Sequence, residues 1–263
     1  MTPIKVVVHG AAGKMGQEII NGLCRETGMQ VVGAVDAMVD KATISLPNGS
    51  GAVPFSSSLD AILASTHPDV VVDFSIARAT LPAVRLAVGK GVNMVIGTTG
   101  LSAGDIEEIR EQAEVHKVGV VVASNFALGA VLMVHLSRIV SKYLDYAEII
   151  ELHHQLKADA PSGTALTTAR AMVQSRGRPF NRAGGQGSAP SRGQDVDGVT
   201  IHSVRLPGLM AHQEVLFGAS GQTLSIRHDT INRECYLPGI IIAVREVGKH
   251  QGLIHGLETL LNL

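Results

Sequence analysis

Apolar positions in the first half of the chain fall into short β-branched runs that alternate with amphipathic segments. Five runs predict strands, over 4–8, 31–35, 70–73, 94–96 and 118–123, and Ala52-Val53 predicts a further short one. Three segments predict helices, over 15–25, after Ser75, and over 102–116. Strands that alternate with helices are typical of βαβ units. This half of the chain therefore predicts an α/β fold with a mostly parallel sheet.

From Tyr146 onward the pattern changes to strands that follow one another. Strands are predicted over 147–153, 199–205, 213–217 and 223–228, with one clear helix over 163–175. The last three strands are joined by short connections, which favours a mixed or antiparallel sheet and an α+β second domain. An apolar helix over 235–248 is expected to pack back on the first domain. We therefore predict one domain over 1–125 and 234–263, and a second over 126–233.

Residues 181–198, NRAGGQGSAPSRGQDVDG, interrupt the second domain without any apolar period. Their glycine, serine and proline content predicts a surface loop, and a lid over a ligand site is the alternative. The pattern alone leaves both interpretations open.

Composition limits the classes of partner. The longest apolar runs are too short to span a bilayer, and the N-terminal sequence MTPIKVVVHG enters a strand pattern without a signal-peptide pattern, so a cytoplasmic protein is expected. A net charge of -1, with no Trp, 3 Tyr and 5 Phe, provides neither a basic field nor a stacking platform for nucleic acid. Cys24 and Cys235 are predicted to be core thiols rather than a disulfide or a metal pair. An anionic ligand must therefore be captured by a local cluster.

A glycine-rich turn joins the first strand to the first helix. In VVVHGAAGKMGQEII, Gly10, Gly13 and Gly16 would let the backbone approach a ligand closely, and the following helix would direct free N–H groups at a pyrophosphate. The spacing departs from G-x-G-x-x-G because Ala12 interrupts it. The next strand ends in Asp36, where a carboxylate would bind an adenosine ribose. Together these features predict a Rossmann-like dinucleotide-binding domain.

Asp36 also bears on the choice of cofactor. Its charge should repel a 2′-phosphate, and Ala37 supplies no guanidinium to attract one. We therefore expect NADH to be used at least as well as NADPH, although Lys14 or Lys41 could restore phosphate binding.

Three further polar segments follow predicted strands. They are Asp73-Phe74-Ser75, Gly97-Thr98-Thr99-Gly100 and Ala123-Ser124-Asn125-Phe126. Each alone would be an ordinary loop. Because ligands bind beyond the carboxyl ends of strands in open parallel sheets, the three together predict a dinucleotide track that ends near Phe126.

Three cationic side chains lie within five positions of the second predicted domain. In ELHHQLKADAPSGTA, Glu151 and His153 share one face of a strand and His154 the other, while Lys157 lies in the turn that follows. Asp159 or Ser162 can cap the next helix, which leaves the N–H groups of Gly163 and Thr164 free for an anion. Lys157 and this turn would hold a carboxylate, and His153 would be placed as a proton donor. A structural strand histidine and an ordinary helix start are the alternatives.

Other chemistries fit this segment poorly. His153 and His154 are adjacent, and no Cys, His or acidic residue completes a zinc site at a usual spacing. The sequence A-P-S-G-T lacks the G-x-S-x-G elbow that would expose Ser162 as a nucleophile. We therefore expect neither a metal site nor an acyl-transfer site.

With these motifs in view, the chain resembles the 4-hydroxy-tetrahydrodipicolinate reductase (dihydrodipicolinate reductase) family over nearly its whole length. The resemblance is carried by GAAGKMG (10–16), DFS (73–75), VIGTTG (95–100), ASNF (123–126), ELHHQLKADAPSGTA (151–165) and SVRLPGLMAHQEVLF (203–217). It implies reduction of a cyclic imine dicarboxylate by NADH, NADPH or both, with loss of water, in the diaminopimelate route to lysine. It also implies a homotetramer that forms through the second domain, which would bind substrate as well.

The resemblance assigns roles to residues. It implies that His153 donates a proton, that Lys157 is the second catalytic residue, and that His154, Gly163 and Thr164 bind substrate. The implied cofactor residues are Gly10, Ala11, Ala12, Gly13, Lys14, Met15, Asp36, Gly97, Thr98, Thr99, Ala123, Ser124, Asn125 and Phe126. Three departures from the family pattern concern cofactor preference: Ala37 replaces an arginine of some members, Ser75 a common threonine, and the connection over 40–55 is short.

Two other classes of function compete with this prediction. Another two-domain NAD(P)-dependent reductase, such as an aspartate or homoserine dehydrogenase, is disfavoured by the doubled histidine and the PSGT turn. A sensor that binds NADH without turnover would be expected to lose the proton donor, yet His153 and Lys157 are both present.

Overall fold

The computed structural model describes residues 2–47, 49–182 and 190–263. The chain divides into two compact units: unit 1 runs to Ala127 and resumes at Tyr236, and unit 2 is Leu128–Cys235. The domain boundaries predicted from the sequence lie two residues away from these bounds. The roles given to the two domains stay predictions.

Unit 1 contains the predicted parallel sheet. Its eight strands are β1 (Ile4–His9), β2 (Met29–Val35), β3 (Thr43–Ser45), β4 (Ala52–Ser56), β5 (Val70–Asp73), β6 (Asn93–Ile96), β7 (Gly119–Val122) and β13 (Gly252–His255). They lie in the order β13-β7-β6-β5-β1-β2-β4-β3, and every neighbouring pair is parallel except β3 with β4. The chain order reverses at β1, since β2 and β5 flank it on opposite sides. Ligands bind at such a reversal in open α/β sheets.

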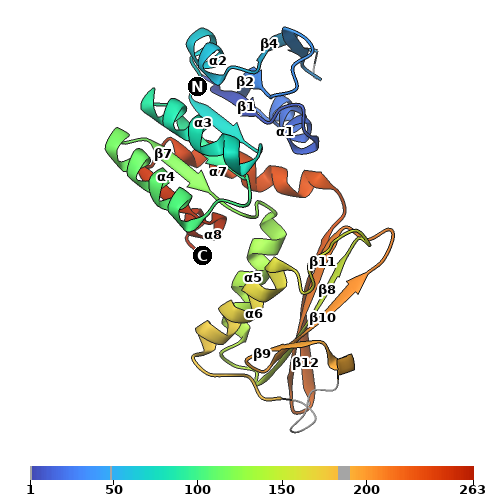
Figure 1. The fold of residues 1–263 in the computed structure, drawn as a ribbon. Coiled ribbons are helices and arrows are strands. Elements are labelled where there is room, and N and C mark those ends of the chain that lie inside the picture. Colours follow the sequence, from blue (N-terminus) through green and yellow to red (C-terminus); the bar gives the residue numbers. More distant parts are fainter. Residues whose placement is uncertain (1, 48, 183–189) are drawn as a thin grey trace. The chain divides into compact units, whose positions relative to one another are not determined.

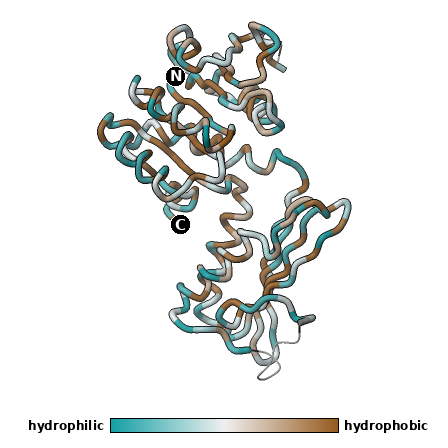
Figure 2. The backbone as a smooth tube through the Cα atoms, in the orientation of Figure 1, coloured by the Kyte–Doolittle hydropathy of each residue, from teal (hydrophilic) through white to brown (hydrophobic). Residues whose placement is uncertain are grey.

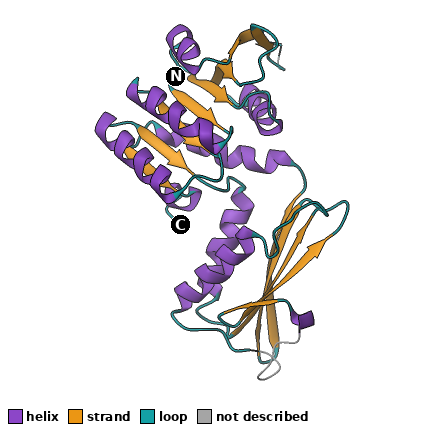
Figure 3. Ribbon diagram, in the orientation of Figure 1, coloured by secondary structure: helices purple, strands orange, loops and turns teal. Residues whose placement is uncertain are grey.

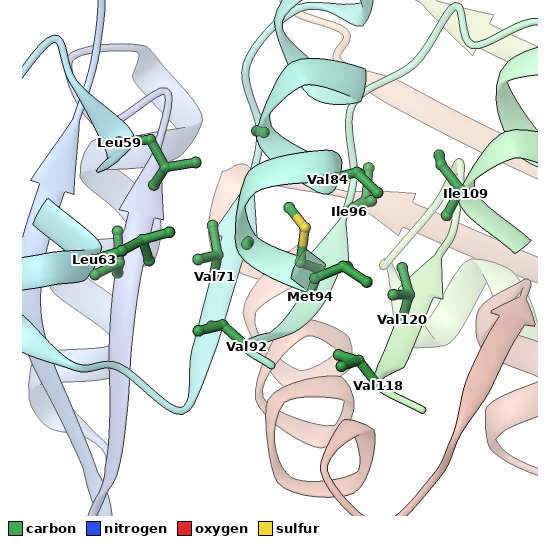
Figure 4. Packing of buried hydrophobic residues seen from close by; sticks show 14 of the residues in the cluster. Leu59, Leu63, Val71, Val84, Val92, Met94, Ile96, Ile109, Val118 and Val120 are labelled. Carbon is green, nitrogen blue, oxygen red and sulfur yellow. The ribbon is translucent and has the colours of Figure 1, made fainter. Parts of the chain in front are cut away.

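Helices cover both faces of this sheet (Figure 3). They are α1 (Lys14–Arg25), α2 (Leu59–Thr66), α3 (Ala77–Gly89), α4 (Ala103–His116), α7 (Leu237–Val247) and α8 (Leu257–Leu260). Helix α4 begins with a capping box, because Ser102 and Asp105 each accept a hydrogen bond from the other's backbone N–H. Figure 4 shows Val84, Met94 and Ile109 packed between the helices and the strands, and all three are fully buried.

Each central strand of unit 1 contains a run of buried apolar residues, which fits a sheet that is buried on both faces. Figure 2 shows hydrophobic residues along these strands, with hydrophilic residues on the outer turns of the helices. Val6, Val7 and Val8 of β1 are each 0% exposed. This layer fixes the carboxyl ends of the strands along one edge, where the polar turns begin.

Unit 2 is the predicted mixed sheet with helices on one face (Figure 1). Its strands are β8 (Tyr146–His153), β9 (Gln194–Val196), β10 (Val199–Arg205), β11 (Ala211–Ala219) and β12 (Gln222–Thr230), in the order β12-β11-β8-β10-β9. Among the described strands of this sheet, only β8 and β10 pair in parallel. Helices α5 (Leu128–Val140) and α6 (Gly163–Arg176) pack on the sheet through a core that includes Met133, Met172, Ile149 and Phe217.

Several elements differ from the sequence prediction. The prediction of a loop throughout 181–198 is wrong at β9, which pairs with β10, and the proposed lid lies partly in residues 183–189, outside the described residues. The C-terminal helix begins at Leu237 rather than at Cys235, after a 3₁₀ turn over Arg233–Tyr236. The prediction also missed α2, α5, α8, β3 and β13. No described helix is long and apolar enough to cross a membrane.

Candidate functional site

The glycine-rich turn lies at the carboxyl end of β1 and is pinned to β2. The N–H groups of Gly10 and Ala11 donate to the carbonyl of Val35 at 2.8 and 3.1 Å. Gly10 has φ +84, which only glycine adopts readily. A Cβ placed on Gly16 would lie 2.1 Å from the Gly10 carbonyl oxygen, so helix α1 can approach the turn only because this position has no side chain. Gly13 and Lys14 remain exposed at the start of that helix.

Asp36, directly after β2, is tied to the same turn. Its carboxylate accepts the N–H of Ala12 at 2.9 Å and that of Met38 at 3.0 Å. An ionised carboxylate has about four acceptor positions. The two backbone bonds therefore orient Asp36 and leave acceptor capacity for the hydroxyl groups of a ligand.

A buried polar network joins the turns that follow β1, β5 and β6. Asp73 is 0% exposed, and its carboxylate accepts the hydroxyls of Thr80 at 2.6 Å and Thr98 at 3.1 Å, and the N–H of Ser75 at 3.2 Å. His9 Nδ1 lies 3.0 Å from Oδ1 of Asp73, the oxygen that also accepts the Ser75 N–H. Burial acts to raise the pKa of Asp73, but His9 and the hydrogen-bond donors outweigh it and hold the pKa below its usual value.

The remaining cofactor residues predicted from the sequence follow strands at the same edge of the sheet. The rings of Phe74 and Phe126 lie 5.5 Å apart, and Gly97 is packed so closely on Phe74 that a Cβ would lie 2.2 Å from the ring. Thr99 and Ser124 are exposed, whereas Phe126 is 1% exposed. The structure therefore brings all fourteen residues to one edge of unit 1. Because the side chains of Ala11, Ala123 and Phe126 are buried, these three residues can meet a ligand only through their backbone atoms.

The second cluster of predicted residues lies at the end of β8 in unit 2 and is built on Glu151. Glu151 alternates with half-buried positions and shares the buried face with Ile149; its side chain is 0% exposed. Arg205 on the neighbouring strand β10 donates two hydrogen bonds to this carboxylate, each 2.8 Å. The same carboxylate lies 2.5 Å from His153 Nδ1 and accepts the N–H of Ser162 at 3.2 Å.

These contacts set the charges of the cluster. Burial acts to raise the pKa of Glu151. The interactions with Arg205, Ser203 and His153 lower this pKa by more than burial raises it, so the carboxylate is ionised. Burial lowers the pKa of His153, and the positive charges of Lys157 and Arg205 add to this, while Glu151 partly opposes it. His153 therefore releases a proton more readily than an exposed histidine does.

The loop after β8 presents the predicted cations. Lys157 Nζ binds both oxygens of the Asp159 carboxylate, at 2.8 and 2.9 Å. Its backbone N–H donates to the carbonyl of His154, whose side chain is exposed. Arg205 also anchors the backbone of this loop, because it donates to the carbonyls of Lys157 at 3.3 Å and Asp159 at 2.6 Å.

Helix α6 begins as the sequence predicts. Ser162 caps it by accepting the N–H of Ala165 at 3.2 Å. Gly163 and Thr164 are exposed, and within the described parts of the chain their N–H groups have no acceptor. Two free donors at a helix N-terminus form a site for a carboxylate or another anion.

The structure thus assembles the predicted residues as two clusters, one in each unit. Sequence reasoning did not assign a role to Glu151 or Arg205, and it named Asp159 only as a possible helix cap, a role that Ser162 takes. The sequence did contain a signal for Glu151, since an acid on the buried face of a strand requires a cationic partner. Within residues 2–47, 49–182 and 190–263, no group of three or more His, Cys, Asp or Glu side chains could hold a metal ion.

Models of one protein family match both units. The model described as dihydrodipicolinate reductase, N-terminus, matches residues 4–126, and the one described as its C-terminus matches residues 129–261. The chain belongs to the dihydrodipicolinate reductase family.

Relatives named 4-hydroxy-tetrahydrodipicolinate reductase match the whole chain. One from Dehalococcoides mccartyi strain BAV1 is 53% identical over 263 residues, which is 100% of both chains. One from Moorella thermoacetica is 47% identical over 261 residues, or 98% of both chains. Among solved structures, dipicolinate-bound dihydrodipicolinate reductase from Paenisporosarcina sp. TG-14 has a TM-score of 0.86 and 36% identity, and covers 98% of this chain and 99% of its own. An amine dehydrogenase from Mycobacterium smegmatis, at 17% identity and a TM-score of 0.66, shares the fold, with 95% of this chain and 94% of that chain covered.

The lowered pKa of His153 predicts how the stability of this dihydrodipicolinate reductase family member depends on pH. The folded-state pKa lies below the ordinary value of 6.5, so the unfolded chain takes up the proton first as the pH falls. This contribution to stability is complete above about pH 6.5 and is lost as the pH falls through the folded-state pKa. His228 adds in the same direction, because burial lowers its pKa too.

We expect His153→Gln to lessen this dependence. Urea unfolding of unit 2, followed between about pH 7.5 and about pH 5.5, should show a smaller fall in stability for the variant than for the wild type. Equal falls in the two proteins would show that His153 is not the group responsible.

Proposed function

We propose that this protein is a 4-hydroxy-tetrahydrodipicolinate reductase, which reduces its cyclic dicarboxylate substrate with NADH or NADPH and releases water. One observation carries the proposal. A single loop presents the His153 imidazole, the Lys157 ammonium and a free helix N-terminus, in a chain whose other unit has a dinucleotide-binding fold. A dianionic substrate needs two sites that bind carboxylates, and a reduced unsaturated ring needs a proton donor.

The residues of unit 1 fit a dinucleotide. The Gly10–Gly16 turn has no side chain where the backbone must be close, and the oriented Asp36 carboxylate can accept hydrogen bonds from ribose hydroxyls. Gly13, Lys14, Gly97, Thr98, Thr99 and the 123–126 segment extend this surface along the edge of the sheet. A bound nicotinamide supplies the hydride.

The residues of unit 2 hold the substrate and move the proton. The N–H groups of Gly163 and Thr164 bind one carboxylate, and Lys157 and His154 also bind the substrate. His153 carries a proton on Nε2 and donates it to the ring carbon that becomes electron-rich on reduction.

We further propose that the protein is a cytoplasmic homotetramer assembled through the unit 2 sheet. In support, the edge strand β12 carries exposed side chains along most of its length, including Leu224 at 43% exposure. A molar mass of about four chains, measured by light scattering, tests the proposed assembly.

An assay with freshly generated substrate tests the activity and the cofactor preference. Because the charge of Asp36 opposes a 2′-phosphate, we expect catalytic efficiency with NADH to be at least equal to that with NADPH. The oxidation of each cofactor is followed by absorbance, with aspartate semialdehyde alone as the control. Turnover of this control in place of the cyclic substrate would favour another two-domain dehydrogenase. An NADH efficiency below about a tenth of the NADPH value would refute the electrostatic argument.

Gly16→Ala tests the nucleotide turn. The added methyl group would lie 2.1 Å from the Gly10 carbonyl oxygen and 2.6 Å from the Ala11 Cα, so the turn must shift. We expect NADH to bind at least about 10-fold more weakly, as measured by its fluorescence. Gly89→Ala at the end of α3 is the matched control, since its added methyl group meets nothing within 4 Å beyond its chain neighbours and the backbone of its own helix. Equal affinity in both variants would place the dinucleotide elsewhere.

His153→Gln tests the proton donor. We expect kcat to fall by about 10²-fold or more, as is usual for the loss of a general acid, with a much smaller rise in KM. His202→Gln is the control, because His202 pairs with Glu148 at 2.7 Å in a similar way on the neighbouring strand. A variant at position 153 with wild-type kcat would remove this residue from the mechanism.

A further inference from the structure

We infer that Glu151 is a positioning residue of the active site: held by Arg205, it orients His153 for proton donation and fixes the turn that binds the substrate carboxylate. The inference rests on the proposed function, and it adds to that proposal the group that sets the geometry of the proton donor.

The contacts of Glu151 are those of a group that positions others. It is 0% exposed, and both carboxylate oxygens are used. One oxygen accepts from Arg205 Nη1 and contacts His153 Nδ1, and the other accepts from Arg205 Nη2 and the Ser162 N–H. Glu151 therefore cannot contact the substrate, and it acts only through its partners.

Arg205 is also excluded from direct substrate binding. Its guanidinium donates to both oxygens of Glu151 and to the carbonyls of Lys157, Val204 and Asp159. A guanidinium has five N–H donors, and these five contacts use that capacity. Arg205 therefore fixes Glu151 in place and cross-links β8, β10 and the loop after β8.

The contact between Glu151 and His153 decides which ring nitrogen faces outward. A carboxylate at Nδ1 favours a proton on that nitrogen in the neutral ring, which leaves Nε2 as the site where a proton is gained and lost. When Nε2 is protonated, the ring is a cation, and the adjacent Glu151 charge stabilises it. Lys157 and Arg205 are the other charged groups that act on His153, and both oppose protonation. Glu151 is thus the charge that keeps His153 able to hold a proton.

The same carboxylate reaches the anion-binding turn. It accepts the N–H of Ser162, the cap of α6, and the next two residues are Gly163 and Thr164 with their free N–H groups. The Glu151 side chain therefore fixes both the orientation of the proton donor, His153, and the conformation of the turn that forms the carboxylate site. A change at Glu151 should disturb both together.

The chain contains a matched control on the same strand. Glu148 of β8 pairs with His202 at 2.7 Å and with Arg192, so it too joins a histidine and an arginine. Its side chain is 33% exposed, and none of its described contacts is with the 154–164 segment. Glu148→Gln removes the same kind of charge without touching the proposed site.

The experiment compares Glu151→Gln with Glu148→Gln. For Glu151→Gln we expect kcat to fall by about 10- to 100-fold, with a rise in substrate KM and unchanged NADH affinity. We also expect the alkaline limb of the kcat profile to move to lower pH, because His153 loses the charge that favours its protonated form. Glu148→Gln should match the wild type in kcat and in the position of the limb. A purely structural role for Glu151 would leave the limb in place.

A second measurement does not depend on the folding of a variant. Nitrogen NMR of the wild-type histidines should show neutral His153 with its proton on Nδ1; a proton on Nε2 would overturn the inference. A wild-type protein without reductase activity contradicts the proposed function. An active wild type with an unaltered Glu151→Gln variant contradicts the role of Glu151 alone.

Discussion

Each unit of this protein is organised around a carboxylate that is removed from water at the carboxyl end of a strand. An ionised carboxylate in such a place is costly unless several donors surround it. In unit 1 the groups around Asp73 come from the last residue of β1 and from residues that follow β5 and β6, and in unit 2 those around Glu151 come from two strands and a loop. Because each acid needs all of its partners, it fixes the backbone of the turns that carry them. The polar turns beyond the strand ends are thereby held in a single conformation.

Much of this arrangement could be predicted from the sequence. The β-branched runs and the helical periods of the first half specify a parallel sheet. The glycine turn and Asp36 could be placed at its edge, because in a parallel sheet the carboxyl ends of all strands meet there. His153 and Lys157 could be placed together because the strand ends between them. These inferences depend only on local pattern and on general rules of topology.

The parts that the sequence did not reveal depend on long-range contacts. Strand β9 is three residues long and forms only against β10, and β13 forms against β7. Helix α5, LGAVLMVHLSRIV, is apolar on most of its surface and so lacks an amphipathic period. Arg205 is 54 positions from Glu151, and nothing in the local pattern relates the two. The register of β8 with β10, which places Arg205 opposite His153, is what joins them.

The two ion pairs at the proposed substrate loop differ in a way that fits their roles. The pair of Glu151 and Arg205 is bidentate and its acid is fully buried, so it holds one geometry. The pair of Lys157 and Asp159 joins a partly exposed cation to an acid whose side chain is 60% exposed, and pairs of this kind are weak because water screens them. In the proposed binding mode, a dianionic substrate that also receives the free N–H groups of the α6 turn would displace Asp159 from Lys157, while Arg205 keeps the loop backbone in place. Because Arg205 fixes the loop backbone and Lys157 can exchange its partner, the loop would bind an anion without first having to fold around it.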